Sequence, residues 1–324
     1  MRILTFDIGG ANIKRIIYDS KSQYFKSDIF YFPIWKKKDE LFEFLRLKSS
    51  SANVVGVTMT AEISDTFFDN ISGIMYIIDA CENSLNNPVY LTVNGEFVKK
   101  ADISDPLELG ASNWIASKYY VEKKYKKGIL LDVGSTTSDI IPFGTKIKIG
   151  KKDLERLING QLVYTGFLRT PISSVVKSVP YRRSLIRIST ELFAITADVY
   201  NVLGMLENYS CDTPDGKGKS KIDSMRRISR HLCASLNDIK EEHILKICEY
   251  VYQVQQEDLA NAISEVVNGY SFKNAYVCGI GSKLGERACE RVGLNTHNLS
   301  GIISGYDNLP CLGMVEMLMD FGKV

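Results

Sequence analysis

Two short turns place an aspartate at the end of an apolar strand and small residues from the second position after it. Asp7 precedes Gly9 and Gly10 in the first turn, and Asp132 precedes Gly134 in the second. Because these turns lack bulky side chains, their backbone N–H groups can converge on a phosphate, while the carboxylate holds a metal ion or its water. The sequence therefore predicts phosphate chemistry at both turns.

Each turn is followed by a second short strand that contains polar residues. These returning strands are expected at residues 12–17 and 138–142. The repeat of strand, turn and strand predicts two hairpins that face one cleft. One such hairpin would be a weak signal, so the prediction depends on the pair.

The composition is that of a folded protein with two domains. The chain has 324 residues, 45% hydrophobic and 24% charged, and one core rarely serves that length. A net charge of +2 gives no reason to expect nucleic acid or an anionic membrane surface as a partner. The N-terminus lacks the pattern of a secretory signal, and no apolar stretch reaches membrane-spanning length, so we expect a cytoplasmic protein.

Cysteine and histidine show no spacing typical of a disulfide framework or a zinc site. The cysteines contain no CxxC pair, which predicts reduced thiols. The histidines lack partner spacing, which predicts no histidine-rich metal site. The residues concerned are Cys81, Cys211, Cys233, Cys248, Cys278, Cys289, Cys311, His231, His243 and His297.

Strands and helices alternate along the chain, which favours an α/β fold over α+β. Besides the two hairpins, the pattern predicts strands at 24–31, 54–57, 74–78, 89–93, 96–98 and 274–278. It predicts helices at 38–47, 105–125, 152–159, 283–292 and 312–321, one from 189 or 190 to 208, and several more between 221 and 268. A lysine-rich run closed by Gly128 marks the expected domain boundary.

The two turns and a later glycine turn resemble a known set of motifs. Residues 7–10, 132–139 and 277–282 are similar to the two phosphate motifs and the adenosine motif of the acetate and sugar kinase/Hsp70/actin superfamily. This resemblance covers the whole chain and implies two duplicated ribonuclease H-like domains around a central cleft. We expect them at 1–127 and 128–324, with a helical insertion at about 189–268 and a terminal helix, 312–324, able to pack back on the first.

Three longer stretches resemble a narrower branch. Residues 57–65, 164–171 and 191–200 are similar to the branch near hydantoinase and oxoprolinase subunits and, within it, to archaeal methanofuran-biosynthesis synthases. This resemblance implies a transferase that joins 5-(aminomethyl)-3-furanmethanol diphosphate to γ-glutamyltyramine, forms an aryl ether and releases diphosphate. Residues 279–282 lack the longer glycine run of adenosine pockets, so no ATP is expected as a cofactor.

The implied reaction needs a base, because a phenol has an ordinary pKa of about 10. The candidates are Glu62, in the loop after a buried strand, and Asp139, on the second returning strand. We favour Glu62 as the base and Asp139 as a ligand of metal or water, although the two roles could be exchanged. Arg169 would bind an anion, either phosphate or the glutamyl carboxylate. Each residue also has a purely structural alternative. Glu62 could cap backbone N–H groups, Asp139 could be an exposed strand carboxylate, and Arg169 could form an ion pair in a domain interface.

The resemblance also implies how diphosphate would be held. Asp7 and Asp132 would organise Mg²⁺ through water, or would only stabilise their turns. Lys14 is as readily explained as a solvated lysine. A lysine-rich loop at 212–221 could close over a diphosphate together with the arginines after it, although such segments are more often only solvated. The expected donors to diphosphate are Gly9, Gly10, Asn12, Lys14, Gly134, Ser135, Thr136 and Thr137.

Two other functions stay open at this point. The same carboxylates would serve phosphoryl transfer, so an ATP-dependent small-molecule kinase or ATPase is the first alternative. A non-catalytic regulatory or assembly subunit that retains the fold is the second. The expected partners are small-molecule substrates, and the sequence makes no prediction of oligomeric state.

Overall fold

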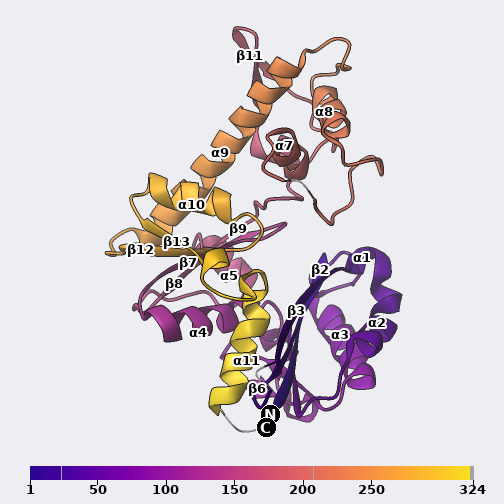
Figure 1. The fold of residues 1–324 in the computed structure, drawn as a ribbon, viewed down its shortest axis with the longest axis vertical. Helices are drawn as coiled ribbons and strands as arrows, with labels where there is room; N and C mark the ends of the chain where they lie inside the picture. The colour runs from indigo at the N-terminus through magenta and orange to yellow at the C-terminus, as the bar shows by residue number, and fades with distance from the viewer. Residues whose placement is uncertain (23, 207, 322–324) are drawn as a thin grey trace. The chain divides into compact units, whose positions relative to one another are not determined.

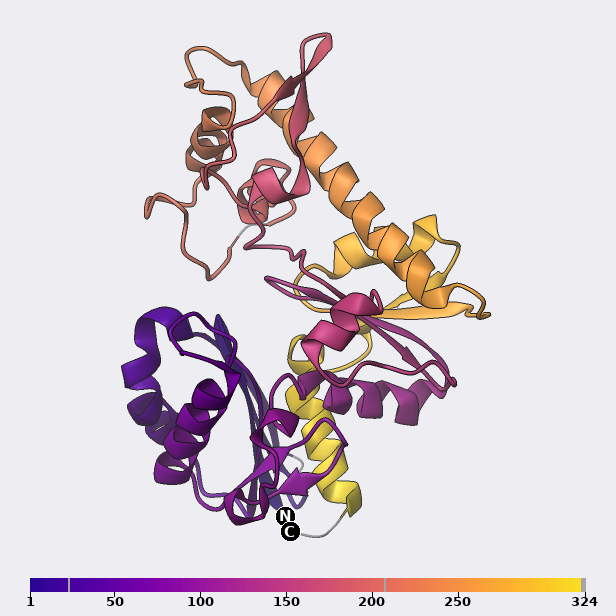
Figure 2. The ribbon, with the colours of Figure 1, turned by 180° about the vertical axis from the view of Figure 1, so that it is seen from behind.

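The computed structural model describes residues 1–22, 24–206 and 208–321, and it contains two compact units (Figures 1 and 2). The chain passes between the units more than once, whereas the sequence suggested one boundary after residue 127. Of the expected terminal helix 312–324, the last three residues lie outside the described ranges. Unit 1 comprises Met1–Gly128, Ile141–Asn159 and Leu299–Val324, and unit 2 comprises Ile129–Ile140 and Gly160–Asn298.

Unit 1 is built on a six-stranded sheet. Strands β1, β2 and β3 form antiparallel pairs, and β4 and β5 run parallel to β1. In sheet order the strands are β3 (Tyr24–Tyr31), β2 (Asn12–Asp19), β1 (Arg2–Gly9), β4 (Val54–Thr60), β5 (Pro88–Leu91) and β6 (Phe97–Val98). Its helices are α1 (Ile34–Lys37), α2 (Leu41–Lys48), α3 (Asn70–Ser84), α4 (Asn113–Tyr125), α5 (Asp153–Ile158) and α11 (Leu309–Phe321).

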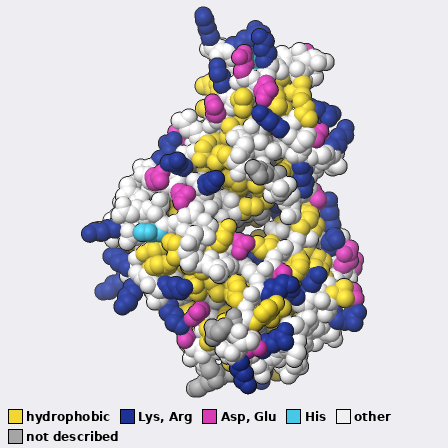
Figure 3. Space-filling view, in the orientation of Figure 1, with side chains coloured by type: hydrophobic (Ala, Val, Ile, Leu, Met, Phe, Trp, Pro, Cys, Tyr) yellow, Lys and Arg dark blue, Asp and Glu magenta, His cyan; other side chains and the backbone are white. Residues whose placement is uncertain are grey.

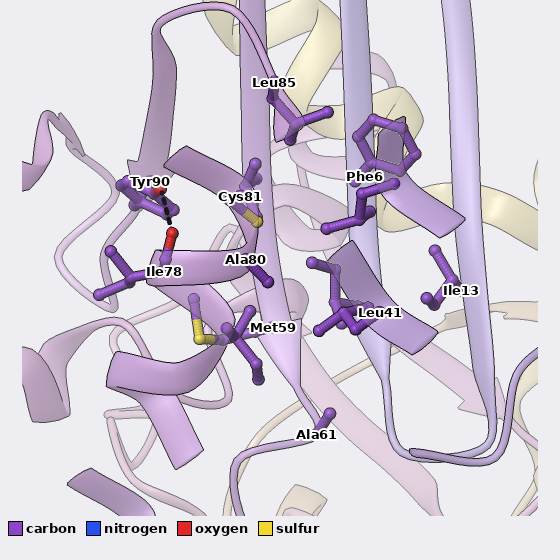
Figure 4. Close-up of a cluster of buried hydrophobic side chains, with 14 of the residues drawn as sticks. Phe6, Ile13, Leu41, Met59, Ala61, Ile78, Ala80, Cys81, Leu85 and Tyr90 are labelled. Atoms are coloured by element: carbon purple, nitrogen blue, oxygen red, sulfur yellow. Dashed lines mark hydrogen bonds between the residues drawn. The ribbon is translucent and has the colours of Figure 1, made fainter. Parts of the chain in front are cut away.

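Helices cover both faces of this sheet, because residues on successive strand positions point to opposite sides. Phe6 belongs to a buried cluster with residues of α2 and α3 (Figure 4). Its neighbour Thr5 donates a hydrogen bond to the Cys311 carbonyl of α11 at 3.2 Å. Figures 1 and 2 show α2 and α3 on one side of the sheet and α11 on the other.

Unit 2 repeats the strand order of unit 1. Its sheet consists of β13 (Asn295–Asn298), β12 (Asn274–Cys278), β7 (Gly128–Val133), β8 (Ser138–Phe143) and β9 (Leu162–Val163). The order 9-8-7-12-13 corresponds to 3-2-1-4-5, so the predicted duplication is present. The other elements are α6 (Ile172–Val175), hairpin strands β10 (Ser178–Tyr181) and β11 (Ser184–Arg187), α7 (Thr196–Val202), α8 (Lys221–Arg230), α9 (Glu241–Val267) and α10 (Ser282–Arg291).

Three predicted elements are wrong. The expected strand at 74–78 lies inside α3, because the Asp69 side chain caps the helix by accepting from the Ser72 N–H. The expected helix at 105–125 is interrupted by residues 109–112, where Gly110 bridges to Met59 and Ala111 has φ 50°. The expected helix at 190–208 is reduced to α7, and its residue 207 lies outside the described ranges.

Close packing of α11 on α4 depends on a glycine. A Cβ at Gly313 would lie 2.0 Å from the Ala116 carbonyl oxygen, which is a backbone atom and cannot rotate away. We expect Gly313→Ala to lower the free energy of unfolding by about 3 kcal/mol, measured by urea denaturation. Gly301→Ala is the matched control, because nothing lies within 4 Å of a Cβ there. Equal urea midpoints for the two variants would contradict this packing.

The charged surface agrees with the small net charge. On the face seen in Figure 3, Lys and Arg side chains are interspersed with acidic ones. Every helix within residues 1–22, 24–206 and 208–321 is too short or too polar to cross a membrane.

Candidate functional site

The candidate residues of unit 1 gather where parallel strands β1 and β4 end. Asp7 lies opposite Thr58, and Gly9 lies opposite Thr60. Because Glu62 follows β4 by two residues, it reaches the same edge of the sheet as the glycine turn. The fold therefore brings together the glycine turn and Glu62, which are about fifty residues apart in the sequence.

The first turn is tightly built around its aspartate. Asp7 is 4% exposed, and its Oδ2 lies 3.9 Å from Lys14 Nζ on the neighbouring strand. A Cβ at Gly9 would approach the Asn12 carbonyl to 2.8 Å, whereas one at Gly10 would meet nothing within 4 Å. The turn thus needs glycine at its first position and leaves open space beside the second.

Glu62 is a buried acid held by close backbone contacts. Its side chain is 4% exposed, and its Oε2 has no hydrogen-bond partner among the described residues. A Cβ at Gly110 would lie 2.8 Å from Oε1, and one at Gly73 would lie 2.4 Å from the Glu62 carbonyl oxygen. The two glycines therefore let the neighbouring segments pack against this residue. If Glu62 only capped backbone N–H groups, its Oε2 would be left without a hydrogen-bond partner.

A cavity of about 60 Å³ opens beside this carboxyl group within unit 1. Its polar lining consists of Glu62, Asn70, Lys152 and Asp153, and its apolar lining includes Ile63, Ile74 and Leu107. The last two polar residues come from α5 and the residue before it. The volume exceeds the space that a single water occupies, so the cavity can receive part of a small molecule.

Helix α5 is fixed beside the cavity by a buried arginine. Arg156 has 2% of its side chain exposed and pairs with Asp153 at 3.4 Å between Nη1 and Oδ1. Its guanidinium also lies over the Trp114 ring, 5.4 Å from the centroid. The place of α5 beside the cavity was not predicted from the sequence, because nothing in its local pattern indicates a partner about ninety residues earlier.

Burial raises the pKa of Glu62 to about 8. The negative charges of Asp153 and Asp7 act in the same direction, whereas hydrogen bonds from the backbone N–H groups of Glu62 and Ala111 oppose them. The acid is therefore largely neutral in the folded protein at neutral pH and ionises in mildly basic solution.

This shift predicts a pH-dependent stability difference. Between pH 4.5, the ordinary value, and pH 8, Glu62 is ionised in the unfolded chain but neutral in the folded one, so stability falls as the pH rises. Glu62→Gln cannot ionise. We expect it to exceed the wild type in unfolding free energy by up to about 5 kcal/mol at pH 8.5, and by less than about 1 kcal/mol at pH 5. Urea unfolding at both pH values measures this; a difference independent of pH would refute it.

The candidate residues of unit 2 occupy the corresponding edge of the second sheet. Asp132 is the penultimate residue of β7 and lies opposite Cys278 of the parallel strand β12. Gly279 has φ 83°, and a Cβ there would lie 2.4 Å from Asp132 Oδ1. The later glycine turn therefore packs directly on the aspartate, and the Gly281 N–H donates to the Val133 carbonyl at 2.9 Å.

The second turn presents hydroxyls and a guanidinium together. Arg169 Nη1 donates to Thr136 Oγ1 at 3.3 Å, and the Arg169 N–H donates to the Ser135 carbonyl at 2.9 Å. The Gly134 N–H donates to the Thr137 carbonyl, so this amide serves the turn itself. Within the described ranges, no backbone acceptor engages the N–H groups of Ser135 and Thr136.

The contact between Arg169 and the turn depends on a further glycine. A Cβ at Gly166 would lie 2.5 Å from backbone atoms of Thr136. Asp139 follows on β8, half-buried and opposite Leu162 of β9. Unit 2 thus holds two carboxylates, hydroxyls and a cation on neighbouring segments around the second turn, and groups of these kinds suit phosphate and Mg²⁺.

The donor sets fit Mg²⁺ held mainly through water. Among the described residues, no three His, Cys, Asp or Glu side chains form a metal-binding group. Mg²⁺ commonly uses only one or two carboxylates and keeps several waters. Asp7 in unit 1 and Asp132 in unit 2 each offer such a carboxylate beside small residues.

The lysine-rich loop 212–221, expected to close over a diphosphate with the arginines after it or to be only solvated, is held by one of these arginines. Arg227, fully buried, pairs with Asp198 and also reaches Asp215 at 3.1 Å and the Gly218 carbonyl at 3.0 Å. This arginine therefore holds the loop 212–221 on α8 and is not an exposed phosphate ligand.

Comparison with known families and relatives gives a consistent result. The model of the family described as hydantoinase/oxoprolinase matches residues 53–306. The (4-{4-[2-(gamma-L-glutamylamino)ethyl]phenoxymethyl}furan-2-yl)methanamine synthase of Methanocaldococcus jannaschii is 38% identical over 288 residues, which cover 87% of this chain and 87% of the relative. The synthase of the same name from Methanococcus vannielii is 40% identical over 162 residues, covering 49% of this chain and 73% of the relative.

Solved structures support the fold alone. A nucleotide-free acetone carboxylase structure matches with a TM-score of 0.55 and 10% identity, covering 97% of this chain and 70% of that chain. The chain has the α/β fold with two duplicated ribonuclease H-like units, as the strand orders also show.

Proposed function

Because this chain belongs to the hydantoinase/oxoprolinase family, we propose that it is a transferase of methanofuran biosynthesis that makes the same furan–phenol ether as its methanogen relatives. The substrates would be 5-(aminomethyl)-3-furanmethanol diphosphate and γ-glutamyltyramine. The observation that carries this proposal is the 38% identity that extends over 87% of both chains.

The reaction exchanges one carbon–oxygen bond for another. The phenol oxygen forms a bond to the furanmethyl carbon, the bond between that carbon and the diphosphate oxygen breaks, and the phenolic proton goes to a base. Diphosphate leaves with the bonding electrons. Hydrogen-bond donors that bind the departing oxygens more strongly in the transition state than in the ground state would accelerate this step.

Glu62 is the base that the geometry favours. Its unused Oε2 lies beside a cavity of unit 1, and burial raises its pKa to about 8. A carboxylate with this pKa accepts a proton from a phenol, whose pKa is about 10, far better than an ordinary glutamate does. Asp139 then retains the role of a ligand to metal or water.

The second turn supplies the contacts for a diphosphate. Its donors are the hydroxyls and N–H groups of Ser135 and Thr136 and the Arg169 guanidinium. In unit 1, Gly10 and Lys14 offer a similar, smaller set. Asp132, and Asp7 in its own unit, would hold Mg²⁺ through water; the ion would supply positive charge that stabilises the leaving group.

A direct assay separates this function from a kinase. Purified protein with Mg²⁺ and both substrates, but no nucleotide, is expected to release diphosphate and the aryl ether in equal amounts, detected by mass spectrometry. A second arm supplies ATP with the same acceptor. Formation of ADP without ether would overturn the proposal in favour of a kinase or ATPase.

A further inference from the structure

The lining of the cavity of unit 1 is apolar on part of its surface and carries a carboxyl group beside that part. Ile63, Ile74 and Leu107 supply an apolar wall, and the Glu62 carboxyl group lies beside it. The glutamate Oε2 is buried and has no hydrogen-bond partner among the described residues. An apolar wall with one acceptor oxygen matches a ring that carries a hydroxyl group.

The charges around the cavity disfavour an anion. Asp153 lines it, Asp7 is close enough to influence the glutamate, and Glu62 would itself repel an anion once it ionises. Lys152 also lines the cavity, which opposes a cationic ammonium group, and Asp153 is already paired with Arg156. A neutral group that donates a hydrogen bond is therefore the best match.

The size and the close packing limit what can enter. A volume of about 60 Å³ accepts the hydroxyl end of a ring but not an entire glutamyl-amide. Gly110 packs closely against one side of the carboxyl group, because a Cβ placed there would lie 2.8 Å from Glu62 Oε1. Substituents next to the hydroxyl group would collide with this lining.

We propose that this cavity binds the phenol end of the acceptor and that Ile63 determines which phenols fit. The inference rests on the proposed function. The ring packs against the apolar wall, and its hydroxyl group donates to Glu62 Oε2. The glutamyl end of the acceptor lies outside the cavity.

The test compares two exposed isoleucines of the same region. Ile63 is 56% exposed and lines the cavity, whereas Ile71 is 47% exposed and is not part of the lining. Both alanine variants are expected to fold, which circular dichroism checks. Ile63→Ala should raise the KM for γ-glutamyltyramine about tenfold, with the KM for the furan diphosphate changed by less than about twofold, while Ile71→Ala leaves both constants within that range.

An altered acceptor provides a second readout. An acceptor with a methyl group next to the hydroxyl should be a poor substrate of the wild type, and Ile63→Ala should improve its kcat/KM relative to γ-glutamyltyramine. Three outcomes would overturn the inference even if the wild type forms the ether. They are equal effects of the two alanine substitutions, a rise in the KM of Ile63→Ala for the furan diphosphate, and an unchanged relative kcat/KM for the methylated acceptor. Absence of ether from the wild type would instead refute the proposed function.

Discussion

Glu62→Gln is expected to lower kcat for ether formation by about 10²- to 10⁴-fold. The amide preserves the shape of the side chain, so the cavity and its glycine contacts stay intact, but it cannot take the phenolic proton. Initial rates with both substrates saturating measure the loss. The variant should be at least as stable as the wild type at pH 7, because it removes the cost of a buried ionisable group.

The pH dependence of the wild type checks the same role. If Glu62 is the base, kcat rises with pH through about 8, where its carboxyl group ionises. This rise of kcat with pH disappears in Glu62→Gln. Asp65→Asn, in the same loop after β4, is the matched control and should leave the profile unchanged. A glutamine variant with wild-type kcat would show that another group accepts the proton.

Arg169→Ala is expected to lower kcat by about 10²- to 10³-fold and to raise the KM for the furan diphosphate. The guanidinium donates to Thr136 Oγ1 at 3.3 Å, beside the N–H groups of Ser135 and Thr136, which no backbone acceptor engages within the described ranges. Its loss removes a cation that stabilises the departing diphosphate. Steady-state kinetics with each substrate varied in turn would separate the donor from the acceptor.

A matched surface arginine controls for net charge. Arg287 lies on α10 of the same unit, with 65% of its side chain exposed and Glu290 at 2.9 Å, so Arg287→Ala should leave both constants close to the wild type. Arg169→Lys should recover only part of the activity, because an ammonium group cannot reproduce the guanidinium fork. An effect confined to the KM for γ-glutamyltyramine would mean that Arg169 binds the glutamyl carboxylate instead.

The parts of the fold predicted correctly are those with a strong local pattern. The returning strand at 138–142 and the strand at 274–278 correspond to β8 and β12, because an apolar run ends there at a glycine or polar turn. The prediction of a strand at 74–78 was wrong for the opposite reason. A short run of apolar residues suits a strand or a buried helix equally, and the Asp69 cap, with Ser72, decides for the helix.

The site was only partly predictable. Asp7, Asp132 and the glycines after them could be proposed from the sequence, because carboxylate and turn are neighbours in the chain; their role stays a prediction. The cavity could not, since it joins Glu62 to residues 107–111 and to α5, which meet only in the folded unit. Similarly, the burial of Arg227 against Asp198 is a tertiary fact with no local signal.

The most direct test of the central claim is isotopic labelling of the phenol. γ-Glutamyltyramine carrying ¹⁸O in its hydroxyl group is incubated with the furan diphosphate, Mg²⁺ and the purified protein, and the products are analysed by mass spectrometry. If the phenol oxygen attacks the furanmethyl carbon, the label appears entirely in the aryl ether, and the diphosphate is unlabelled and formed in equal amount. Label in a phosphorylated product, or no labelled ether, would contradict the account.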